Sequence, residues 1–161
     1  TTYEDLRQAL ARMLVEDRKV PRENSRPKYE LSYEVAGEPQ AVVVDLAVFA
    51  SDGVPLLALF FCPGEVGTFV RESVAAARIH LPHPFPLVAV TDSMDMFLVE
   101  TRTGDRLADG FHAIPLWADL PGLAAKHPCL PLAEERLDKE RRILTAYAGL
   151  GGPCCGGECS L

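Results

Sequence analysis

Two long apolar runs, at residues 41–50 and 54–62, place the strongest constraint on the fold. Residues 41–49 are rich in β-branched side chains, and a Ser-Asp-Gly turn separates this run from the second one. Runs of this composition are typical of strands that are buried on both faces of a sheet. A sheet of this kind needs helices on both faces to cover its apolar side chains. We therefore predict an α/β (α+β) fold, with a mixed central sheet flanked by helices.

The remaining elements follow from the periodicity of the apolar residues. Leu6, Leu10 and Leu14 recur at helical spacing and predict an amphipathic first helix over residues 3–19. A charged loop is expected at residues 21–28, and an alternating pattern predicts a strand at 31–35. The other expected elements are a helix at 67–80, strands at 87–91 and 96–100, a long loop, and a helix at 132–147. The predicted order is αβββαββα.

Length and charge narrow the function classes. A chain of 161 residues suits one domain, which we place at residues 1–148, followed by a Gly/Cys-rich C-terminal tail at 149–161. The net charge of −7 makes nucleic acid a disfavoured partner, although a local basic groove could still bind it. Neither apolar run is long enough to cross a bilayer, and no secretory signal is visible, so we expect a cytoplasmic protein with no membrane partner.

Several blocks of sequence together resemble one known family. The blocks are a first helix with Glu4 and Arg7, the strand Val-Val-Val-Asp-Leu-Ala-Val-Phe at 42–49, the apolar strand ending in Phe-Phe-Cys-Pro at 60–63, and Val-Thr-Asp-Ser at 90–93. In this order they resemble the N-terminal domain of type I restriction enzyme R subunits, over roughly residues 3–120. The resemblance implies a restriction-endonuclease-like fold of the PD-(D/E)XK nuclease superfamily. It also implies a site that handles DNA.

The resemblance implies a catalytic site that this chain carries only in part. In such nucleases an aspartate on the second strand and an acid-x-lysine on the third strand hold magnesium and position a water molecule. Asp45 matches the aspartate, but Phe61 and Pro63 occupy the positions of the acid and the lysine. Neither can ligate magnesium or supply an ammonium group, so we expect no magnesium site. Asp45 is then a relic ligand or a structural acid, and Glu65 is a candidate for a substitute carboxylate, with Glu4 or Glu16 on the first helix as a third.

Three functions remain open at this point. The leading hypothesis is a catalytically inactive nuclease-fold protein that acts as a binding or regulatory module, alone or as a homodimer. The second is a divergent metal-dependent DNA endonuclease that uses Asp45 and Glu65. The third is a small metal or redox protein in which the fold carries cysteine ligands.

The third hypothesis depends on a cluster of cysteines. Four of the five cysteines are Cys129, Cys154, Cys155 and Cys159, and the last three lie within a glycine-rich stretch. Thiolates that converge in this way suit tetrahedral zinc or an iron–sulfur cluster. Adjacent cysteines strain a shared metal, so a reduced or disulfide-prone tail is the alternative.

Overall fold

The strands of the protein form one mixed sheet in which neighbours in space are neighbours in sequence. The computed structural model describes residues 2–62, 66–92 and 94–149. Within these residues six strands have the spatial order β1-β2-β3-β4-β5-β6. Their bounds are Ser25–Val35, Glu38–Phe49, Pro55–Phe61, Leu87–Thr91, Met96–Glu100 and Arg106–Asp109. Strands β3 and β4 are parallel, and all other neighbouring pairs are antiparallel.

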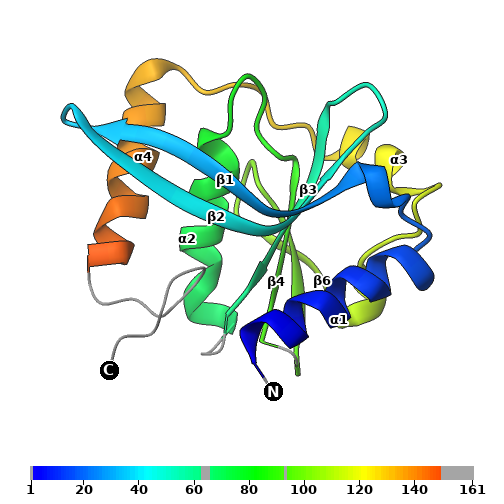
Figure 1. Cartoon of the computed structure of the whole chain (residues 1–161). Helices are drawn as coiled ribbons and strands as arrows, with labels where there is room; N and C mark the ends of the chain where they lie inside the picture. Colours follow the sequence, from blue (N-terminus) through cyan, green and yellow to red (C-terminus); the bar gives the residue numbers. More distant parts are fainter. Residues whose placement is uncertain (1, 63–65, 93, 150–161) are drawn as a thin grey trace.

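Helices cover both faces of this sheet. The bounds of α1, α2, α3 and α4 are Tyr3–Glu16, Val66–Ile79, Leu120–Lys126 and Glu134–Gly149, with short 3-10 helices η1 at Arg22–Asn24 and η2 at Phe111–Ala113. Helices α2 and α4 lie side by side over one face, and α1 crosses the other (Figure 1). None of the helices in the described ranges is long and apolar enough to cross a membrane.

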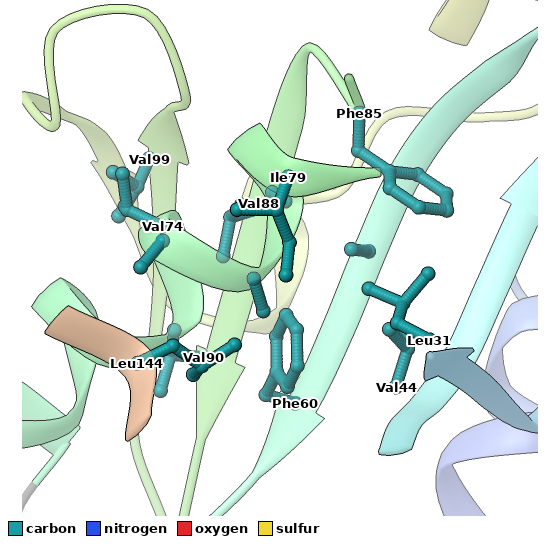
Figure 2. Close-up of a cluster of buried hydrophobic side chains, with 14 of the residues drawn as sticks. Leu31, Val44, Phe60, Val74, Ile79, Phe85, Val88, Val90, Val99 and Leu144 are labelled. Carbon is teal, nitrogen blue, oxygen red and sulfur yellow. The ribbon is translucent and has the colours of Figure 1, made fainter. Parts of the chain in front are cut away.

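Strand β3 divides its side chains between the two covered faces, because successive residues of a strand point in opposite directions. Leu57, Leu59 and Phe61 join the buried cluster under α1 and α3. Ala58 and Phe60 join the cluster under α2 and α4, where Figure 2 shows Phe60 among the buried aliphatic side chains. Every residue of β3 is buried, which explains why its sequence is a continuous apolar run.

The predicted α/β class and the sheet flanked by helices are confirmed, and so is the packing of the first helix. Leu10 and Leu14 are buried against residues of β2 and β3, and Leu6 lies partly buried beside them. The predicted division at residues 148 and 149 stays a prediction, because residues 150–161 lie outside the described residues.

The predicted order needs three corrections. The loop expected at 21–28 contains the start of β1, whose Pro27 is tolerated because β1 is an edge strand and a missing N–H costs little there. The long loop before the last helix contains β6 and α3. Strand β6 has four partly exposed residues, and α3 has seven with proline in its first turn, so neither produces a clear apolar period.

The ladder between β1 and β2 is interrupted at one pair of residues. The Cα pairs run from Ser25↔Val48 to Pro27↔Leu46 and resume at Tyr29↔Val44, leaving out Lys28 and Asp45. Lys28 has a φ of 50°, a left-handed conformation that is uncommon for a side chain other than glycine. The pairing of β2 with β3 also ends beside this point, at Leu46↔Leu59. Asp45 therefore occupies the place where β2 separates from β3.

Candidate functional site

Asp45 is fully buried, and both of its carboxylate oxygens have partners. The side chain has 0% exposure. Its Oδ2 accepts a hydrogen bond from the backbone N–H of Phe61 at 2.6 Å, and its Oδ1 accepts one from the hydroxyl of Tyr3 on α1. The carboxylate thus joins the end of β3 to the first turn of α1, where β2 and β3 no longer pair directly.

Burial dominates the protonation of this acid. Removal of solvent raises the pKa of Asp45 above its usual value, because the charged form loses hydration. The hydrogen bonds from Tyr3 and Phe61 and the positive charge of Arg7 lower the pKa and oppose this effect without cancelling it. A carboxylate in this environment depends on its donors to stay charged.

A group of ion pairs near Asp45 joins Glu4 and Arg7 of α1 to Lys28 of β1. Glu4 Oε2 accepts hydrogen bonds from Arg7 Nε at 3.1 Å and pairs with Lys28 Nζ at 3.0 Å. These partners, Arg7 before Lys28, lower the pKa of Glu4 to about 2. Tyr3 and Arg7 are four residues apart and so lie on one face of α1. The possible third carboxylate, Glu4, is therefore already committed to two bases.

Phe61 places an aromatic ring next to Asp45, at the position where the resemblance would put a second carboxylate. Its ring centroid lies 5.9 Å from that of Tyr3. The ring also lines an apolar pocket of about 220 Å³ whose other walls are Leu6, Ala9, Leu10, Met13 and Phe111. None of the residues that line this pocket has a side-chain oxygen that could bind a hard cation. Phe61 contributes apolar surface and one backbone donor to the site.

The structure brings together only some of the residues that the sequence suggested. Asp45 and Phe61 are neighbours, while Pro63 and Glu65 lie outside the described residues. Within the part of the chain that is described, no group of three or more His, Cys, Asp or Glu side chains could hold a metal ion. A role for Glu65 stays a prediction.

Of the cysteines predicted as metal ligands, the structure describes Cys129 alone. Cys129 lies in the segment of the chain that connects α3 to α4. Its side chain is partly buried, and burial raises the pKa of its thiol. Cys154, Cys155 and Cys159 lie outside the described residues, so the expected metal centre stays a prediction.

Sequence reasoning missed two partners of the site, Tyr3 and Lys28. Tyr3 could have been found from its position four residues before Arg7 on an amphipathic helix, since that spacing places both over one patch of the sheet. Lys28 gave no signal, because its role depends on a local interruption of the strand ladder.

Comparison of the chain with family models, with curated proteins and with solved structures finds no match. The function is therefore inferred from the residues of the site and their geometry. Asp45, Tyr3 and Phe61 define a closed polar contact inside a mixed α/β domain.

Proposed function

We propose that this chain is a binding or regulatory module with a restriction-endonuclease-like fold that has lost nuclease chemistry. The observation that carries the proposal is the closed environment of Asp45. Both oxygens of the aspartate are occupied by donors of the protein itself, and the side chain has no contact with solvent.

A magnesium ion at Asp45 would meet two physical obstacles. It would have to enter a site where the carboxylate has no exposure to solvent, and each buried donor that it displaced, the Tyr3 hydroxyl or the Phe61 N–H, would be left unpaired at a cost of about 1–3 kcal/mol. Among the described residues it would also lack a second free carboxylate, because the neighbouring side chain is the ring of Phe61 and Glu4 is paired with Arg7 and Lys28. Phosphodiester cleavage needs charge at both the attacking and the leaving oxygen, which one enclosed aspartate does not supply.

The topology supports the fold assignment within this proposal. Helix α1 is followed by the antiparallel meander β1-β2-β3, and helix α2 then leads to a parallel strand, β4. This is the core order of restriction-endonuclease-like domains, and Asp45 lies on the second strand of the meander. A shared order of elements does not define a function, so the proposed loss of nuclease chemistry depends on the environment of Asp45.

A plasmid-nicking assay tests the loss of chemistry. We expect the purified protein to leave supercoiled plasmid and single-stranded DNA intact in magnesium and in manganese, and calorimetric titration with manganese to give no binding heat. An Asp45→Asn protein is the matched control, because it keeps the size of the side chain. Cleavage by the original protein that is lost in Asp45→Asn would overturn the proposal and would point to Glu65 as the second carboxylate.

A further inference from the structure

A groove separates helix α1 from the start of strand β1, next to the Asp45 site but distinct from it. Its volume is about 450 Å³, within the usual range for small-molecule sites. One wall is a single face of α1, because the contributing positions are spaced by one, three or four residues. The lining residues are Arg7, Gln8, Ala11, Arg12, Val15, Arg22, Ser25, Pro27 and Leu46.

The charge of this groove is opposite to that of the whole chain. Three arginines and no carboxylate line the groove, although the chain has a net charge of −7. Arg7 is neutralised in part by its ion pair with Glu4. Arg12 and Arg22 are exposed, and neither forms an ion pair or a side-chain hydrogen bond with any residue in the described ranges. Two guanidinium groups are therefore available to an anion.

A buried hydrogen bond holds the backbone that carries Arg22. The amide of Asn24 donates to the backbone oxygen of Phe49 at 3.0 Å, and Asn24 itself is buried. This bond ties the 3-10 helix that begins at Arg22 to the end of β2. Arg7, at 8% exposure, forms part of the groove wall under the two free arginines. A ligand would thus meet a site whose backbone is already in place, which lowers the ordering cost of binding.

We propose that this groove binds a small organic phosphate, with the phosphate between Arg12 and Arg22 and the organic part over the apolar wall. Guanidinium groups donate planar, paired hydrogen bonds that match phosphate oxygens. The hydroxyl of Ser25 supplies a further donor on the β1 side of the groove. Ala11, Val15 and Pro27 offer apolar surface to the body of the ligand. This inference rests on the proposed binding role and names its ligand class.

A small ligand suits the observations better than a nucleic acid. A duplex contacts many phosphates over a long basic surface, and the acidic chain as a whole repels such a polymer. The two free arginines instead form one local site that can neutralise a single phosphate group.

Calorimetric titration with three probes tests the proposal on the full chain. The probes are inorganic phosphate, adenosine monophosphate and adenosine. We expect the first two to bind, the monophosphate more tightly, and adenosine to give no heat. A protein carrying both Arg12→Gln and Arg22→Gln should bind the monophosphate about tenfold or more weakly, because both lost side chains are charge-assisted donors. The melting temperature should stay unchanged, because both residues are exposed.

A second double variant, Lys126→Gln with Arg136→Gln, is the matched control, because it removes the same charge from exposed positions outside the groove. It should bind the monophosphate like the original protein. Equal weakening in the control, or no binding of either phosphate probe at millimolar concentration, would overturn the proposal. Tighter binding of a short DNA duplex, lost in the Arg12 and Arg22 variant, would also overturn it and assign the groove to nucleic acid. None of these results depends on the plasmid assay, so the two proposals fail separately.

Discussion

Replacing Tyr3 with phenylalanine removes one hydroxyl group from Asp45 and leaves the aromatic packing on Phe61 in place. A hydrogen bond to a charged group contributes about 1.5–3 kcal/mol to the free energy of unfolding. For a domain of this size, each kcal/mol shifts the melting temperature by about 2–4 °C. We therefore expect Tyr3→Phe to melt roughly 3–12 °C below the original protein at neutral pH.

The effect of this substitution should depend on pH in a defined direction. Burial raises the folded-state pKa of Asp45, and the Tyr3 hydrogen bond limits that rise. A group with a raised folded-state pKa loses stability as pH rises from its unfolded value, here 3.8, to its folded value. Without Tyr3 the folded value rises further, so the loss continues to higher pH. The difference between the two proteins should be smallest in acid and largest at neutral pH.

Thermal unfolding followed by circular dichroism between about pH 4 and pH 8 measures both effects, since it compares the two proteins from near the unfolded pKa of aspartate to neutral pH and above. Tyr33→Phe is the matched control, because the Tyr33 hydroxyl bonds the neutral hydroxyl of Thr145 at 3.2 Å. We expect the control to cost only about 0.5–1.5 kcal/mol, with no change in pH dependence. If Tyr3→Phe behaved like the control at every pH, Asp45 would not be a buried charge held by Tyr3.

Two further predictions concern α4 and the cysteine tail. Glu140 is 5% exposed, and its carboxylate pairs with Arg78 of α2 at 2.8 Å. In denaturant unfolding, Glu140→Gln should lower the free energy of unfolding by about 3–5 kcal/mol, because it leaves a buried arginine without its charged partner. The control, Glu134→Gln, removes an exposed partner of Arg141 and should lower it by less than about 1 kcal/mol. Equal costs would show that the pair of α2 and α4 is not held by this charge. Metal analysis of protein purified without chelator or a histidine tag should find stoichiometric zinc or iron that is lost in Cys155→Ser. If the protein were metal-free and chelator left its melting temperature unchanged, the predicted metal centre at the cysteines would be wrong.

Periodicity predicted the elements that are buried on a regular pattern. Helix α1 and strand β3 were found because their burial produces helical spacing in one and a continuous apolar run in the other. The start of β1, strand β6 and helix α3 were missed because each is short or lies at an exposed edge, where burial imposes little pattern. The sequence therefore revealed the covered centre of the sheet better than its margins.

The candidate site was predicted in the same partial way. Asp45 stood out as a lone acid in an apolar strand, and Phe61 as an aromatic residue at an expected acid position. The contact with Tyr3 could not be derived, because it depends on how α1 crosses the sheet. The position of Lys28 depends on its own left-handed backbone conformation, which no periodic pattern in the sequence indicates. Arg12 and Arg22 line one groove because the 3-10 helix η1 brings Arg22 next to α1, and the sequence does not indicate this.

The interruption of the strand ladder at Lys28 also affects whether strand β1 can pair with a strand of a second copy of the chain. Strand β1 is an edge of the sheet, and an unbroken edge of 11 residues would offer a template for pairing with a second chain. Pro27 has no N–H to donate, and the left-handed turn at Lys28 redirects the backbone, so the free edge is divided into two short pieces. Replacing Pro27 and Lys28 with good strand formers would make the edge continuous and able to pair with a strand of a second chain. We therefore expect the segment that carries the Lys28 amine to the Glu4 carboxylate also to limit pairing of this edge with another chain.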